Sequence, residues 1–393
     1  MPAQKKAGLP ALTSLRFFAA LAIVVHHCNG VFWPAVALGP LDVGVSFFFV
    51  LSGFILTYVY RDMAPGGSAR VRFYRARVAR IWPLHLTCLL LTILLIRIPE
   101  PFDPAVLLAN LLLLQAWIPF DRFFFSYNYV AWSISTELFF YLLLPLLVVH
   151  ARRWIGTGIL LALIAVAVLA VGSDQAELGR WETTGNQLSA TGLLYTNPLA
   201  RLAEFLIGVA AGLIFMQRRD TDVDAGITLR WSMVEIGSIA LLLCAYWFLL
   251  SGFAPIVHRL WLMFGMTALP LGTGADETAL LEQISPLAGT LVTEWADHVG
   301  LTPFAVAVIY VFAHQRGRLS HLLSQRWLVF CGEISFALYL VHQITLRWVQ
   351  QHFTQLGFGA FLVFMASVLL LAALLHRLIE QPCRRWLTRQ PAA

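Results

Sequence analysis

Charged side chains are scarce in this sequence: they make up 12% of its 393 residues, about half the share found in soluble globular domains. Hydrophobic residues make up 59%. This balance excludes an ordinary water-soluble domain. Apolar runs of roughly 20 residues, long enough to cross ~30 Å of hydrocarbon, recur along the chain. We therefore expect an all-α, polytopic membrane protein embedded in a lipid bilayer.

Paired cysteines and the common catalytic motifs are also missing. The five cysteines are scattered, so no disulfide framework or zinc site is predicted and no metal is expected. We find no P-loop, no Gly-x-Gly-x-x-Gly fingerprint, no His-Glu-x-x-His and no Gly-x-Ser-x-Gly. The net charge of +6 does not indicate nucleic-acid binding, because the basic residues lie at the ends of apolar runs.

Ten apolar runs predict about ten transmembrane helices. They cover residues 12–31, 42–60, 81–98, 132–150, 154–172, 198–216, 231–252, 300–314, 328–349 and 358–377. With the N-terminus inside, most of the 27 lysines and arginines fall in inside segments, as expected for cytoplasmic loops. Both termini are therefore predicted to be cytoplasmic. The first run is interpreted as a retained helix rather than a signal peptide, because Arg16 lies within it and no cleavage site follows.

Two segments depart from the simple pattern of spans. Residues 104–118 are apolar but short, and counting them as a span would place Arg152 and Arg153 outside, so we predict a re-entrant or interfacial segment. Residues 254–299 contain apolar patches broken by proline and glycine, which favours an outer loop with interfacial helices. The chain then divides into a cytoplasmic N-terminal tail (1–11), a transmembrane domain (12–377) and a cytoplasmic C-terminal tail (378–393).

The first predicted helix carries Arg16 and His27, and ionisable residues inside a membrane suggest a function because inserting them is costly. They are eleven positions apart, so at about 100° per residue they project from one face, roughly 16 Å apart along the axis. A buried cation favours an anionic ligand, and an imidazole can accept a proton near neutral pH. The alternative is that Arg16 snorkels to headgroups and His27 bonds a neighbouring helix. His26 points about 100° away and is interpreted as structural.

A second candidate site is the basic segment that follows the second predicted helix. If this segment is helical, Arg77 and Arg80 are i, i+3 neighbours, and two adjacent guanidinium groups suit phosphate oxygens. A headgroup contact or a plain topology signal is the alternative.

Two acidic residues complete the candidates. Glu137 lies at the outer start of a predicted helix, with Ser133 and Tyr141 one turn away on the same face. Its carboxylate can orient a base or bind a sugar hydroxyl, or it can cap the helix and pair with a neighbouring helix. Arg201 and Glu204 are spaced to pair locally, which favours a structural role.

These residues fall in motifs that resemble the acyltransferase-3 family of membrane proteins, which acylate sugars and related acceptors. Six elements occur in order over nearly the whole chain: Arg16-x10-His27, Gly44-Val-Ser-Phe-Phe-Phe-Val-Leu-Ser-Gly-Phe54, Arg77-Val-Ala-Arg80-Ile-Trp-Pro83, Trp132-Ser133-x-x-x-Glu137-x-x-Phe140-Tyr141, Glu333-Ile-Ser-Phe-Ala-Leu-Tyr-Leu-Val-His342 and Ile379-Glu-Gln-Pro382. Each element is weak alone, but the ordered set is specific. One departure is Gly44-Val-Ser46, where the family often has glycine and aspartate.

The resemblance implies an O-acyltransferase of the bacterial inner (plasma) membrane. The donor would be acetyl-CoA or another acyl-CoA, and the acceptor a hydroxyl of a carbohydrate or lipid-linked glycan, such as a surface or exopolysaccharide unit. The implied site residues are His27, Arg16 and Glu137 for catalysis, Arg77 and Arg80 for the coenzyme A phosphates, and Asn128, Trp132 and Ser133 for substrate binding. His27 is expected to act as general base, although a transient acyl-histidine is also chemically possible.

A different class of function competes with this interpretation. Intramembrane arginine, histidine and glutamate also occur in proton-coupled transporters of organic anions. The lack of a detectable internal repeat and the presence of the Arg77/Arg80 pair favour the enzyme. The sequence leaves the oligomeric state open. With no stretch for a soluble domain, we expect the activity to reside in the membrane body.

Overall fold

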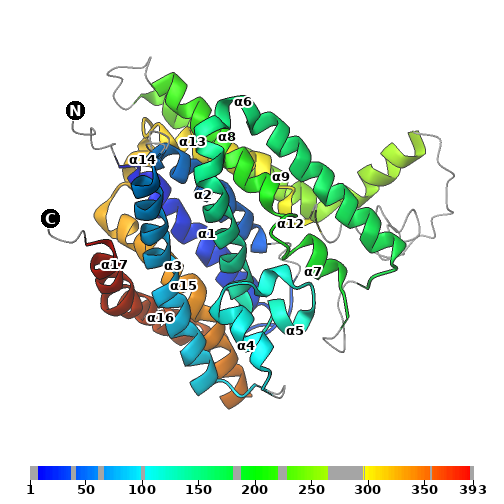
Figure 1. Ribbon diagram of the computed structural model, residues 1–393, viewed down its shortest axis with the longest axis vertical. Helices are drawn as coiled ribbons and strands as arrows, with labels where there is room; N and C mark the ends of the chain where they lie inside the picture. Colours follow the sequence, from blue (N-terminus) through cyan, green and yellow to red (C-terminus); the bar gives the residue numbers. More distant parts are fainter. Residues whose placement is uncertain are drawn as a thin grey trace.

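The chain folds into a bundle of helices. The computed structural model describes residues 8–36, 41–60, 66–98, 102–179, 187–219, 228–263, 295, 297–354 and 356–389. Over these residues it contains no strand, only one isolated bridge between Phe120 and Leu188. The all-α prediction is therefore confirmed. The start of α1 (Pro10–Cys28) and the end of α17 (Gln381–Thr388) lie on the same side of the bundle (Figure 1).

Eight helical segments of the described chain are long and apolar enough to cross a membrane. They are α1, Leu41–Tyr60 (η1 and α2), Gly67–Leu95 (α3), Tyr129–Leu147 and Arg153–Gln175 (within η3 and α6), Leu229–Phe248 (in α9), Arg326–His352 (α15) and Phe358–Thr388 (α16 through α17). Two predicted spans are helical but fall outside this set: α8 (Leu202–Arg219) carries three charged residues, and α13 (Thr302–Ala313) rises only about 18 Å. The multi-pass architecture is confirmed, and a total of ten spans stays a prediction.

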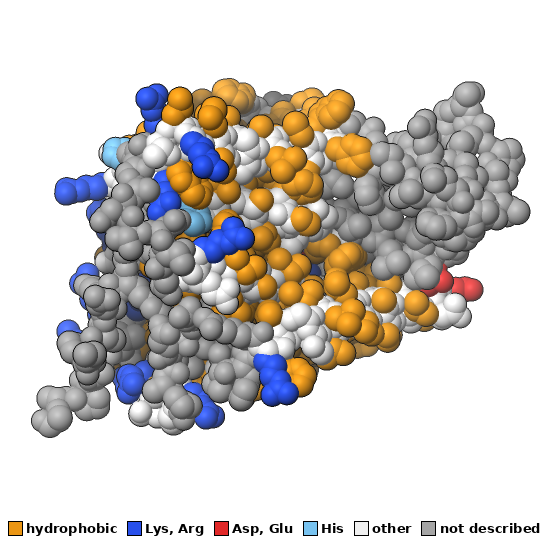
Figure 2. Space-filling view, turned by 90° about the horizontal axis from the view of Figure 1, so that it is seen from above, with side chains coloured by type: hydrophobic (Ala, Val, Ile, Leu, Met, Phe, Trp, Pro, Cys, Tyr) orange, Lys and Arg blue, Asp and Glu red, His pale blue; other side chains and the backbone are white. Residues whose placement is uncertain are grey.

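The surface matches a body surrounded by lipid. On the face shown in Figure 2, hydrophobic side chains cover the middle, Lys and Arg side chains gather toward one end, and the visible acidic side chains lie at the opposite end. Large apolar side chains such as Leu94, Val168 and Val363 are more than half exposed. Lipid tails solvate such surfaces, whereas water does not. This distribution agrees with a topology in which the basic end is cytoplasmic.

Three predicted helix boundaries are wrong. The helix α3 begins at Gly67 rather than at 81, so Arg77 and Arg80 lie on a helix and not in a loop. The helix α9 (Leu229–Met263) runs past the predicted end at 252. The helix α16 (Phe358–Leu375) continues through the π-turn η5 (His376–Glu380) into α17, past the predicted end at 377. Hydropathy marks where apolar side chains stop, but a helix can continue past that point, because charged residues such as arginine are good helix formers.

The segment 104–118 does not form a span. It holds the eight-residue helix α4 (Pro104–Leu111) and the short turn η2 (Gln115–Trp117), and eight residues rise only about 12 Å. The predicted outer loop 254–299 lies largely outside the described residues, which here comprise the end of α9, Trp295 and the short helix α12 (Asp297–Val299).

The helix α6 (Trp132–Gln175) supplies two of the predicted spans, because it bends into two arms (Figure 1). On the first arm, Thr136 donates a hydrogen bond to the Thr196 carbonyl. On the second arm, Ala170 packs in one cluster with Ala200. Thr136 and Ala170 are 34 residues apart in the sequence, yet both contact the short segment from Thr196 to Ala200. The two arms of α6 therefore run antiparallel, as two separate spans would.

Close backbone packing between α2 (Gly44–Tyr60) and α8 positions the centre of the bundle. A Cβ atom at Gly53 would collide with the Phe205 carbonyl oxygen, and one at Gly208 would collide with the Val50 carbonyl oxygen. Small residues that let two helix backbones touch are typical of membrane helix pairs. This contact fixes α2, whose opposite face contributes to the cavity described below.

We expect Gly208→Ala to destabilise the protein by about 1–3 kcal/mol, because the added methyl group overpacks the contact. The matched control is Gly237→Ala on α9, where an added Cβ meets no atom within 4 Å and alanine is the better helix former. Thermal unfolding of the detergent-solubilised variants checks this. Equal melting temperatures for the two variants would contradict the close contact.

Candidate active site

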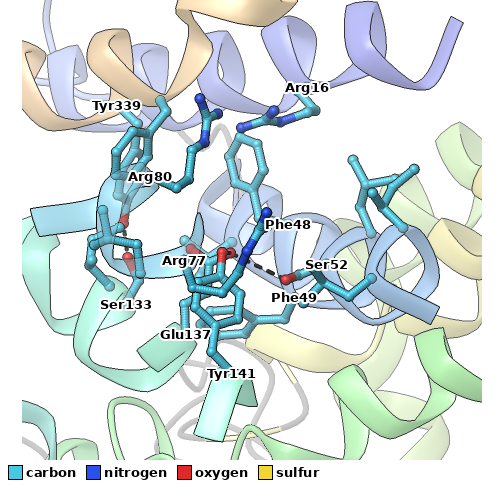
Figure 3. A pocket seen from close by; sticks show the side chains of 17 residues that line it. Arg16, Phe48, Phe49, Ser52, Arg77, Arg80, Ser133, Glu137, Tyr141 and Tyr339 are labelled. Carbon is cyan, nitrogen blue, oxygen red and sulfur yellow. Dashed lines mark hydrogen bonds between the residues drawn. The ribbon is translucent and has the colours of Figure 1, made fainter. Parts of the chain in front are cut away.

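A cavity with both polar and apolar side chains in its wall lies inside the bundle, where α1, α2, α3, the first arm of α6 and α15 meet (Figure 3). Its volume is about 140 Å³. The polar residues in its wall are Arg16, Ser52, Arg77, Arg80, Ser133, Glu137, Tyr141 and Tyr339. Apolar side chains, including Phe48, Phe49 and Ile81, complete the wall. Three arginines and one glutamate that the sequence offered as separate candidates therefore share one space.

Helical spacing explains which residues reach this cavity. Ser133, Glu137 and Tyr141 follow each other at i, i+4 and i+8 on α6, so their side chains project on one face. Arg77 and Arg80 are i, i+3 neighbours on α3. Residues that the sequence spacing places on one helix face therefore line the cavity together, both on α3 and on α6.

Glu137 is held by hydroxyl donors from two helices. Its Oε1 atom accepts a hydrogen bond from Ser52 Oγ at 3.2 Å and one from Tyr141 OH at 2.5 Å. The Arg16 side chain points into the same cavity (Figure 3). Among the described residues, no carboxylate lies within ion-pair distance of Arg16. The cavity therefore contains a guanidinium group available to an anionic or strongly polar ligand.

The two arginines of α3 have different surroundings. Arg80 forms an ion pair with Glu380 of η5, and Glu380 also bonds His376 Nδ1 at 2.8 Å. The Arg77 guanidinium lies 5.5 Å from the ring centroids of Tyr60 and Tyr141, and it donates to Tyr60 OH at 3.2 Å. The Arg77 Nε atom is buried without a hydrogen-bond partner. Arg77 therefore has one N–H group without an acceptor and no carboxylate partner among the described residues, whereas Glu380 neutralises the charge of Arg80.

His27 lies beyond the wall of the cavity and contacts a second histidine. His27 Nδ1 is 3.1 Å from Nε2 of His342, which lies on α15. Tyr339, three residues before His342, lines the cavity, and the Tyr339 and His342 rings are 5.9 Å apart. The predicted common face of Arg16 and His27 therefore extends from the cavity through Tyr339 to the histidine pair.

The predicted substrate-binding residues divide into two groups. Ser133 lines the cavity, and its hydroxyl lies 2.8 Å from Tyr339 OH. Trp132 and Asn128 do not line it. Trp132 packs against Tyr195 with 4.7 Å between ring centroids, and the buried Asn128 amide donates to the Leu340 carbonyl at 2.9 Å. Adjacent helix positions differ by about 100°, so Trp132 cannot share the direction of its neighbour.

A separate buried network lies beside Trp132. Arg201 and Glu204 form the predicted local pair, with 2.8 Å between Nε and Oε2. Asp42 pairs with His298 Nδ1 at 2.7 Å and accepts a hydrogen bond from Tyr195 OH at 3.0 Å. Burial, and then the neighbouring Asp42 carboxylate, raises the pKa of Tyr195, so this hydroxyl stays protonated as a donor.

Two residues of the site were not predicted. Glu380 and His342 both stand within sequence motifs noted above, but no role follows from those motifs. Glu380 contacts a residue 300 positions away, and His342 a residue 315 positions away. A histidine within an apolar run is the only local signal for the His342 contact. Glu380 lies past the predicted end of the last run at 377, so it offers no such signal.

Comparison with known proteins supplies the family. Residues 9–377 match the acyltransferase domain of the acyltransferase-3 family. The chain is 30% identical to acyltransferase MdmB of Streptomyces mycarofaciens, over 97% of this chain and 93% of that protein. It is 24% identical to O-acetyltransferase OatA of Staphylococcus aureus, over 96% of this chain but 57% of OatA, so it spans little more than half of that relative. No solved structure matches the chain.

The family match favours the enzyme over the transporter hypothesis. The resemblance drawn from the six motifs is confirmed, as is the prediction of an acyltransferase of the O-acetyltransferase type. The matched domain contains several helices long and apolar enough to span a membrane. The chain belongs to the acyltransferase-3 family and is a multi-pass membrane acyltransferase.

Proposed function

We propose that the protein moves an acetyl or other short acyl group from acyl-CoA to a hydroxyl of a carbohydrate at the bacterial inner membrane. The acceptor would be a unit of a surface polysaccharide or its lipid-linked precursor. The observation that carries this proposal is the convergence of Arg16, Arg77 and Arg80 on one cavity, whose wall residue Tyr339 lies beside the His27–His342 pair. Cationic groups at one end and a base at the other are what transfer from a phosphorylated donor to a hydroxyl requires.

The two ends of the acyl-CoA donor match the two ends of this arrangement. Coenzyme A carries its phosphates at one end and its thioester at the other, joined by a slender pantetheine arm. Arg77 would bind phosphate oxygens at the basic end of the bundle. Arg80, already paired with Glu380, would add a donor beside it. In this proposal the nucleotide stays at the basic end, and only the slender arm enters the cavity. The arm would pass Arg16, which lies roughly 16 Å from His27 along α1.

The chemistry at the far end is a simple acyl exchange. His27 accepts the proton of the acceptor hydroxyl while that oxygen attacks the thioester carbonyl carbon. The carbon–sulfur bond breaks, and the coenzyme A sulfur leaves and takes up the proton from His27. The products are the O-acyl ester and free coenzyme A. Glu137 would hold Ser52 and Tyr141 in the wall along the route of the donor.

The direct test is acyl transfer by the purified protein in proteoliposomes. Radiolabelled acetyl-CoA is supplied with a panel of oligosaccharides and lipid-linked glycans, and protein-free liposomes are the control. We expect label to appear in an alkali-labile ester of at least one glycan, with release of free coenzyme A. Transfer to amines or lipids alone, or no use of any acyl-CoA, would refute the proposal.

The donor site can be tested separately with Arg77→Met. A charge-assisted hydrogen bond contributes about 1.5–3 kcal/mol, so KM for acyl-CoA is expected to rise about 10- to 100-fold. Arg75→Met is the matched control, because Arg75 is on the same helix but donates to the Leu387 and Arg389 carbonyls. Steady-state kinetics with varied acyl-CoA measures both. A similar rise in KM for the two variants would show that the effect is only one of overall charge.

A further inference from the structure

His342 occupies an unusual position for a titratable residue. It is fully buried in α15, the helix that also contributes Tyr339 to the cavity. Its two ring nitrogens have different neighbours. Nδ1 is 3.3 Å from the Leu338 carbonyl oxygen, and Nε2 is 3.1 Å from Nδ1 of His27. Both nitrogens of His342 are therefore engaged, one by the backbone and one by the proposed base.

For two neutral rings, these contacts are both hydrogen bonds under only one assignment of the protons. A carbonyl oxygen only accepts hydrogen bonds, so Nδ1 of a neutral His342 must carry the ring proton. Its Nε2 atom is then bare and accepts. The partner in that second bond, Nδ1 of His27, must be the donor and carry the proton of its own ring. The remaining nitrogen of His27, Nε2, is left with a free lone pair.

We propose that His342 is the positioning residue that holds His27 in this tautomer and orientation, so that His27 Nε2 is the atom that accepts the proton of the acceptor hydroxyl. This inference rests on the proposed function, in which His27 is the base. In it, a neutral histidine takes the place that a carboxylate holds in the better-known His–Asp pairs. An acceptor without charge suits the interior of a membrane, where an added carboxylate would be costly.

The surroundings of the two histidines hold the His342 ring in a fixed position next to His27. The rings of His27 and His342 are tilted by 35° with centroids 5.2 Å apart. The helix α15 is tied to the loop before α6 by the bond from Asn128 to Leu340, between Tyr339 and His342. Tyr339 itself donates to the Val130 carbonyl at 3.1 Å. The acceptor atom that faces His27 is thus anchored to the cavity wall.

Two variants separate positioning from packing. His342→Leu fills the space without an acceptor, and His342→Gln can place its side-chain oxygen where the Nε2 atom stood. We expect kcat to fall about 100-fold in His342→Leu, with KM for acyl-CoA unchanged. His342→Gln is expected to keep at least about a tenth of the wild-type kcat. Wild-type kcat in a folded His342→Leu protein would overturn the proposal.

A spectroscopic measurement addresses the tautomer itself. Solid-state ¹⁵N NMR of the wild-type protein in bilayers, with His27 assigned by its loss in His27→Asn, reports which ring nitrogen is protonated. A proton on Nδ1 supports the proposal, and a proton on Nε2 overturns it. This readout does not depend on turnover. Failure of wild-type transfer would therefore count against the proposed function, and a wrong tautomer against the role of His342.

Discussion

Replacement of His27 by alanine is expected to abolish acyl transfer, with kcat falling by about 10²- to 10⁴-fold, the range that a general base contributes. The physical reason is that the acceptor hydroxyl is a weak nucleophile until its proton is removed during attack. No other described histidine bonds His342, so no neighbour supplies a base in the same place. Transfer from labelled acyl-CoA in proteoliposomes measures the loss.

The matched control is His26→Ala. The rings of His26 and His27 are 5.4 Å apart, but adjacent positions on a helix point about 100° apart. The control therefore removes an imidazole from the same turn of α1 and leaves the bond to His342 in place. We expect His26→Ala to keep transfer within about tenfold of wild type. Intact transfer in His27→Ala would refute the catalytic role of His27.

The bundle follows from the sequence to the extent that hydropathy decides it. Apolar runs located α1, α2, α15 and α16, because a lipid-facing helix needs an unbroken apolar length. They misplaced the start of α3, whose first turns carry arginines. The Arg77 guanidinium group of this helix is received by the rings of Tyr60 and Tyr141 and by the Tyr60 hydroxyl. Such partners come from other helices and leave no trace in local hydropathy.

The candidate site was predicted in pieces rather than as a whole. Spacing along one helix correctly grouped Arg77 with Arg80, and Ser133 with Glu137 and Tyr141, because a single helix fixes those directions. It gave no way to place the two groups around one cavity. It also left the partners of His27 and Arg80 unknown, since each partner lies 300 or more residues away along the chain. Long-range pairing is a property of packing between helices and has no local period.

Replacement of Arg16 by methionine is expected to lower kcat/KM for acyl-CoA about 100-fold. Arg16 faces the cavity without an ion-pair partner among the described residues, so its guanidinium group is available to the polar arm or phosphates of the donor. Methionine keeps much of the length and removes the charge. Arg16→Lys is the control that keeps the charge but loses the planar fork, and it should recover transfer only in part.

The same change has a second effect that can be measured without any substrate. Glu137 shares the cavity with Arg16, so removal of the cation leaves the carboxylate with one nearby positive charge fewer, and we expect a lower melting temperature. The double variant Arg16→Met/Glu137→Gln should regain this stability, because the glutamine oxygen still accepts from Ser52 and Tyr141. It should not regain transfer.

Thermal unfolding and transfer assays on the four proteins of this cycle then separate the two roles of Arg16. Recovery of both quantities would mean that Arg16 serves only as the counter-ion of Glu137. Recovery of stability alone would leave binding of the donor as its function.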